Sequence, residues 1–239
     1  MKIEADLHTH TVASGHAYSS VGEIAKSARD KGLKLIAITD HGPGMPGGPH
    51  EYYFGNLKAI PDVVHGVRIL KGIEANILNT GELDLSVERL EELDFVAAGI
   101  HGDVDYNKKS RLEHTEVTIT AIKNPYVDMI THPANLYFPL DLEAVVQAAA
   151  EYQVILEVNA SSLEEPRLGK RGSYELTIQL CRLAKKYGAP LSMNSDAHFF
   201  TQVGNIKSLK PVIEQAELTE EDILNTDARK VESFILNRK

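Results

Sequence analysis

Three histidines lie close together near the start of the chain. His8, His10 and His16 fall within nine positions, after a short run, residues 3–7, whose pattern is typical of a β-strand. His8 and His10 are two residues apart, so in an extended strand they point to the same side. Neutral imidazoles are good ligands for zinc, manganese and iron. This spacing indicates a metal site.

The elements that must position these histidines follow a regular alternation. Strands are predicted at residues 3–7, 33–39, 67–73, 95–100, 127–131, 154–158 and 190–193, and helices at 21–31, 52–64, 87–92, 112–123, 142–152, 174–187 and 202–215. Such alternation predicts a parallel sheet built from βαβ units. The last stretch, 218–239, predicts one or two short helices on the outside. No low-complexity linker divides the chain, so we expect one domain over residues 1–239.

Further metal-competent side chains fall where predicted strands end. In parallel α/β folds, active sites are assembled at this face. Unrelated histidines would scatter over helices and loops, so their joint placement predicts a polynuclear metal centre. Six of the seven strands contribute, through His8 and His10, His41, Glu74, His101, His132, and Asp196 with His198.

Composition limits the alternatives. Cys181 is the only cysteine, so any metal must be held by nitrogen and oxygen ligands. The net charge of −9 argues against an extended nucleic acid or an anionic membrane surface as partner. No stretch approaches the roughly 20 apolar residues of a membrane span, and the first ten residues carry charges without an apolar stretch behind them. A cytoplasmic protein is expected.

Six motifs carry a family resemblance. The segments DLHTHTVASGHAYS (6–19), ITDHGP (38–43), GIEAN (72–76), GIH (99–101), ITHP (130–133) and NSDAH (194–198) resemble, in this order, the PHP (polymerase and histidinol phosphatase) family. Among its members the chain looks like the stand-alone bacterial phosphatases of the YcdX type. The resemblance implies a distorted (βα)7 TIM-like barrel with three divalent metal ions at the carboxyl ends of the strands. Zinc is the usual ion, with manganese or iron as alternatives.

The resemblance also implies a role for each motif residue. The first metal would be held by His8, His10, Glu74 and Asp196, the second by Glu74 as a bridge with His101 and His132, and the third by His16, His41 and His198. Among these, Glu74, Asp196 and His198 are the expected catalytic residues.

Three divalent ions beside two carboxylates would favour a polyanion, such as the phosphate of a monoester. A water whose pKa is lowered by a metal toward about 7 can attack phosphorus in line. We therefore predict hydrolysis of a small phosphomonoester without a covalent intermediate.

Other residues have supporting roles in this prediction. Asp6 and Asp40 flank the ligand histidines and could accept their ring N–H groups. Asn159 ends the one strand without a ligand and could contact the substrate. The candidate phosphate contacts in the following loop are Arg167, Lys170 and Arg171.

Several alternatives stay open from the sequence. A phosphodiesterase or 3′–5′ exonuclease acting on short nucleic acid would share the metal chemistry, as would a histidinol-phosphate phosphatase. A metal-dependent amidohydrolase also begins with HxH, but it needs eight strands. A metal-stabilised interaction module is the non-catalytic alternative. The family resemblance further implies a homo-oligomer, a trimer in similar proteins.

Overall fold

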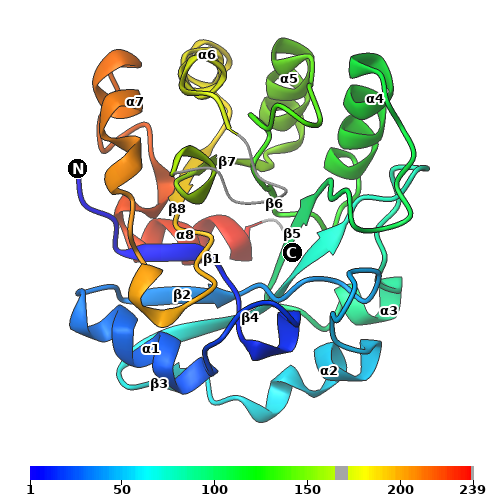
Figure 1. Cartoon of the computed structure of the whole chain (residues 1–239). Helices are drawn as coiled ribbons and strands as arrows, with labels where there is room; N and C mark the ends of the chain where they lie inside the picture. The colour runs from blue at the N-terminus through cyan, green and yellow to red at the C-terminus, as the bar shows by residue number, and fades with distance from the viewer. Residues whose placement is uncertain (165–171, 238–239) are drawn as a thin grey trace.

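A nearly closed barrel of parallel strands forms the centre of the computed structural model, which describes residues 1–164 and 172–237. Figure 1 shows the strands at the centre with helices around them. The strand order is β1 (Ala5–Thr9), β2 (Leu35–Ile38), β4 (Val67–Asn76), β5 (Phe95–Gly99), β6 (Met129–Ile130), β7 (Ile155–Asn159) and β8 (Leu191–Asn194). All neighbours in this order pair in parallel, and the short β3 (Val63–Val64) pairs with β4 in antiparallel. The predicted distorted (βα)7 barrel is confirmed.

Helices follow most strands, and those before the last helix surround the barrel. They are α1 (Val21–Asp30), α2 (Glu51–Asn56), α3 (Val87–Leu90), α4 (Arg111–Ile122), α5 (Leu142–Tyr152), α6 (Tyr174–Tyr187), α7 (Lys210–Gln215) and α8 (Ala228–Leu236). Reciprocal side-chain and backbone hydrogen bonds start α1 at Ser20 and Glu23, and α4 at Ser110 and Glu113. Within residues 1–164 and 172–237, no helix has the length and apolar character needed to cross a bilayer.

Two predicted helices are shorter than expected. The helix predicted at 52–64 ends with α2 and a turn at Leu57–Ala59, because His65 (φ 54°) and Gly66 (φ 83°) form a hairpin turn that pairs β3 with β4. The helix predicted at 202–215 is interrupted at Gly204, which has a φ of 67°. Only α7 is regular helix there, and Pro211 in its first turn favours that start.

The last helix closes the barrel at one end, which corrects the expectation that it lies outside. In α8, Ala228, Val231 and Ile235 pack in one apolar cluster with the first residues of β2, β5, β6 and β7. These residues mark the amino-terminal end of the barrel. The carboxyl end is therefore the end left for the predicted site.

Asn225 joins the two strands that border the seam of the barrel. Its buried side-chain Nδ2 donates to the carbonyl oxygens of Ala5 on β1 (2.8 Å) and Met193 on β8 (2.7 Å), and its Oδ1 accepts the Met193 N–H at 3.0 Å. Beyond the strands, the His10 N–H donates to the Ala197 carbonyl at 2.9 Å. The Asn225 amide thus takes the place of a missing strand partner.

Replacing Asn225 should weaken the fold. Asn225→Ala removes these three buried hydrogen bonds, and at about 1–3 kcal/mol for each buried group left unsatisfied we expect a loss of at least about 3 kcal/mol in unfolding free energy. Urea denaturation measures this loss. Asn237→Ala, at an exposed position after α8, is the matched control. Equal stabilities of the two variants would contradict the role given to Asn225.

Candidate metal centre

The carboxylate of Glu74 lies at the centre of the histidine cluster. Glu74 is fully buried near the end of β4. Its Oε2 lies 3.2 Å from Nε2 of His8, 3.5 Å from Nε2 of His10 and 2.9 Å from Nδ1 of His41. Three imidazoles, from β1 (His8), just after β1 (His10) and after β2 (His41), thus surround one carboxylate oxygen.

The second oxygen of the Glu74 carboxylate lies close to another pair of imidazoles. Glu74 Oε1 lies 3.3 Å from Nε2 of His101 and 3.0 Å from Nε2 of His132, which follow β5 and β6. One carboxylate therefore joins two groups of imidazoles, the geometry that a bridging ligand requires.

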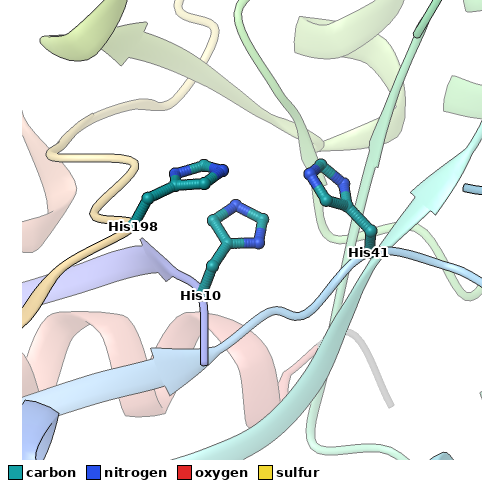
Figure 2. A group of neighbouring side chains, drawn as sticks. All are labelled: His10, His41 and His198. Carbon is teal, nitrogen blue, oxygen red and sulfur yellow. The ribbon is translucent and has the colours of Figure 1, made fainter. Parts of the chain in front are cut away.

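Asp196, His198 and His16 complete the cluster on its other side. Asp196 Oδ1 lies 3.3 Å from Nε2 of His10 and 3.4 Å from Nδ1 of His198. His10, His41 and His198 come from three different strand ends, and Figure 2 shows their rings facing a common space. The exposed His16 ring lies 4.9 Å from that of His41 and 5.0 Å from that of His198 between centroids. All nine predicted motif side chains therefore lie together.

These side chains provide closely spaced ligand atoms of the kind that bind a cation. Three triads have ligand atoms within 4.8 Å of one another, namely His10, His41 and His198; His8, His10 and Glu74; and His41, Glu74 and His101. Buried polar atoms normally have hydrogen-bond partners. Here Nε2 of His8, His10 and His101 and Oε2 of Glu74 are buried without one. A divalent cation would satisfy these atoms, and imidazole with carboxylate suits zinc, manganese or iron.

Hydrogen bonds on the far side of the rings fix their orientation. The Nδ1–H of His8 donates to Glu157 at 2.8 Å, that of His101 to Oδ1 of Asn76 at 2.8 Å, and that of His10 to Oγ of Ser14 at 3.1 Å. The Asn76 amide nitrogen donates to a carboxylate, so its oxygen must face His101. When such a ring binds a metal as a neutral imidazole, Nε2 is the ligand atom, and it points into the cluster. Burial would lower the pKa of His8, but Glu157, Glu74 and Asp196 hold it well above its usual range, so a metal must displace a proton from this ring.

The charge states of two central groups suit metal binding. Burial alone would raise the pKa of Glu74, but His8, His101 and His41 hold it well below its usual range. Burial and the neighbouring imidazoles of His198 and His41 hold the pKa of His10 well below its usual range. At neutral pH Glu74 is therefore a carboxylate and His10 a neutral imidazole, the forms in which both groups bind metals.

The predicted roles of Asp6 and Asp40 need correction. Asp40 accepts the Ser14 hydroxyl at 2.6 Å, so it acts on His10 through Ser14. Asp6 faces away, where it accepts the Ser195 hydroxyl at 2.5 Å and the Gly204 N–H at 2.7 Å. The pairing of β1 with β2 shifts between Asp6 and Thr9. Such an irregularity breaks the two-residue alternation that would place Asp6 on the same side of β1 as His8.

The predicted substrate contacts have different outcomes. Asn159 lies at the end of β7 as predicted, and its amide donates to Glu157 at 2.9 Å and to Asp196 at 3.2 Å. This geometry suits a residue that positions carboxylates. The other three candidates, Arg167, Lys170 and Arg171, lie outside the described residues.

Glu157 is the residue that the sequence reasoning missed. It lies on β7, the strand expected to contribute no metal ligand. Its buried carboxylate accepts the His132 N–H at 2.7 Å and the Asn194 amide at 3.2 Å, in addition to hydrogen bonds from His8 and Asn159. His132 has a φ of 34°, in the left-handed region, which costs about 1–3 kcal/mol and needs support from its surroundings. A lone glutamate inside an apolar strand was the available signal.

Glu157→Gln should weaken metal binding. The change places an amide donor where the N–H groups of His8, His132 and Asn159 converge, so His8 loses its fixed orientation. Loss of such an outer partner typically costs about 10–100-fold in metal affinity. Competition with a chromophoric chelator measures the affinity, and Glu151→Gln on the exposed side of α5 is the control. An unchanged metal affinity in Glu157→Gln would show that metal binding does not need the hydrogen bond from His8 to the Glu157 carboxylate.

Comparison with known proteins identifies the family. The PHP domain family model matches residues 6–164. A relative from Acetivibrio thermocellus named "Probable phosphatase" is 45% identical over 240 residues, covering 100% of this chain and 98% of the relative. Another with that name, from Aliivibrio fischeri, is 40% identical over 239 residues, covering 100% and 95%. The predicted enzyme class, a phosphoesterase hydrolase, is confirmed.

Solved structures share the fold. The histidinol phosphate phosphatase from Lactococcus lactis, solved with zinc, L-histidinol and phosphate, superposes with a TM-score of 0.62 at 16% identity, covering 92% of this chain and 95% of that one. A chain of an archaeal ribonuclease P bound to mature tRNA gives a TM-score of 0.58 at 15% identity, covering 97% and 90%. The motifs, the barrel and the close relatives agree: the chain belongs to the PHP domain family.

Proposed function

We propose that the protein is a metal-dependent phosphatase that hydrolyses a small phosphomonoester. The observation that carries the proposal is the Glu74 carboxylate, buried among five imidazoles at the carboxyl end of the barrel. Three divalent ions, zinc first, would be held by His8, His10, His16, His41, Glu74, His101, His132, Asp196 and His198.

A pocket beside the cluster supports a small substrate. It has a volume of about 480 Å³, and His16, His41, His101 and His132 form part of its lining. Pockets of about 300–1,000 Å³ are typical of sites for small molecules. The imidazole cluster is thus within reach of a compact phosphate ester.

The proposed reaction is attack of water on phosphorus, with cleavage of the P–O bond to the organic group and release of an alcohol and phosphate. Bound metal ions would offset the negative charge on the phosphate oxygens and lower the pKa of a bound water. Glu74 would hold the two imidazole groups at a fixed separation. Asn159, whose amide donates to Asp196, keeps that carboxylate turned toward His10 and His198.

The test compares two esters with different charge and shape. Protein loaded with zinc or manganese should release p-nitrophenol from p-nitrophenyl phosphate faster than from bis(p-nitrophenyl) phosphate, and His16→Ala should lose this activity. His65→Asn removes a histidine in an exposed turn and keeps a residue that tolerates positive φ, so it should be fully active. Turnover of the diester alone would favour the phosphodiesterase or exonuclease alternative. No turnover of either ester would contradict a general phosphatase.

A further inference from the structure

The pocket beside the metal cluster is lined by two chemically different sets of side chains. One set consists of imidazoles, and the other, here called the apolar wall, consists of Met45, Ile100, Tyr137 and Phe138. Among the described lining residues there is no lysine or arginine, and Asp103 is the one carboxylate. A phosphate that reaches the imidazoles therefore places its organic group against apolar side chains.

The apolar wall is preformed. The Phe138 ring stands edge-on against Tyr106 (5.8 Å between centroids, 88°) and His114 (5.6 Å, 88°). These two rings lie nearly parallel and are joined by a hydrogen bond of 2.8 Å between the Tyr106 hydroxyl and Nδ1 of His114. His114 is buried in α4. Edge-to-face packing of this kind holds a ring in one orientation.

Tyr137 extends the wall at the surface. Its side chain is 57% exposed, although it lines the pocket beside Phe138. Asn135, the one carboxamide among the described lining residues, already accepts the Tyr137 N–H through its Oδ1 at 2.9 Å. The described lining therefore offers few polar partners to a substrate with many hydroxyl groups.

We propose that this pocket selects phosphomonoesters whose organic group is a flat apolar ring, which lies against Phe138 and Tyr137. The inference rests on the proposed phosphatase function and adds the substrate class. A sugar phosphate would bury hydroxyl groups against Met45, Ile100 and Phe138, where each unpaired group is costly. An aromatic ring would instead gain apolar contact with the two rings.

The test uses two esters of primary alcohols, so that the leaving groups have similar intrinsic reactivity. Benzyl phosphate should have a kcat/KM at least about tenfold above that of glucose 6-phosphate, mainly through a lower KM, because the pocket discriminates by apolar contact and by unpaired hydroxyl groups. Tyr137→Ala and Phe138→Ala should each raise KM for benzyl phosphate while metal content stays unchanged. The KM for glucose 6-phosphate should not move. Tyr52→Ala, which removes an exposed ring outside the pocket lining, is the control.

The outcomes separate this inference from the proposed function. Equal kcat/KM for the two esters, or equal KM changes for both in Tyr137→Ala, overturns the substrate class and leaves the phosphatase function standing. Because Tyr137 is largely exposed, its removal tests the wall even if Phe138→Ala fails to fold. A metal-loaded protein that hydrolyses neither ester but does hydrolyse p-nitrophenyl phosphate overturns the substrate class alone, and one that hydrolyses none of the three overturns both.

Discussion

Glu74→Gln should abolish phosphatase activity and bound metal together. The carboxylate contacts five imidazole nitrogens through its two oxygens. A carboxamide of the same shape carries no charge and presents an N–H₂ donor on one side, so it cannot bridge two groups of ligands. Because loss of an outer partner alone costs about 10–100-fold, loss of the central carboxylate should cost more than about 100-fold in activity.

The experiment measures metal content by elemental analysis and turnover of p-nitrophenyl phosphate for the same samples. Glu151→Gln is the matched control, since it makes the same chemical change on an exposed helix face. Circular dichroism shows whether the Glu74 variant keeps its fold. A folded Glu74→Gln protein with full metal content and more than a tenth of the activity would contradict the central position given to this carboxylate.

Metal removal should lower both activity and thermal stability. Ions that bind only the folded state stabilise it by about 2.7 kcal/mol at a concentration 100 times the dissociation constant. For a chain of this size, each kcal/mol corresponds to roughly 2–4 °C in Tm, so chelation should lower Tm by about 5–10 °C. The reason is local: without a cation, Nε2 of His8, His10 and His101 stays buried without a hydrogen-bond partner.

Dialysis against dipicolinate followed by differential scanning calorimetry measures the Tm change, and adding zinc or manganese should restore both Tm and turnover. Glu74→Gln serves as the control, because its Tm should respond little to chelator or metal. A wild-type protein whose Tm and turnover are the same before and after chelation would show that the cluster needs no metal.

The sequence predicted the location of the cluster because parallel strands bring their carboxyl ends to one face. Buried strands such as β5 (Phe95–Gly99) read as continuous apolar runs, as expected when both faces are covered. The limits of α6 were also predicted, since Gly188 at a φ of 72° ends that helix. Both inferences depend on local pattern alone.

The sequence did not predict contacts between residues that are far apart along the chain, or irregular strand pairing. Glu157 interacts with His8 across 149 residues, and no local pattern reports such a pair. The irregular pairing in β1 turned Asp6 away from the histidines. The single-domain organisation, the metal count and the ligand assignments stay predictions.

Two glycines show why the motifs contain residues that bind nothing. A Cβ at Gly99 would lie 2.2 Å from Oγ1 of Thr131 and 2.9 Å from Cε1 of His132, so a side chain there would displace a ring of the cluster. At Gly15, with a φ of 78°, a Cβ would lie 2.4 Å from the Gly47 carbonyl oxygen. This close approach packs the loop that carries His16 against the glycine-rich loop 42–49.

A titration of metal into metal-free protein, followed by phosphate release from p-nitrophenyl phosphate, tests the central claim most directly. We predict that activity is absent without metal, rises with each addition and stops rising at three ions per chain, as measured by elemental analysis. Activity that is independent of added metal, or that is complete at one ion per chain, would contradict a three-metal phosphatase.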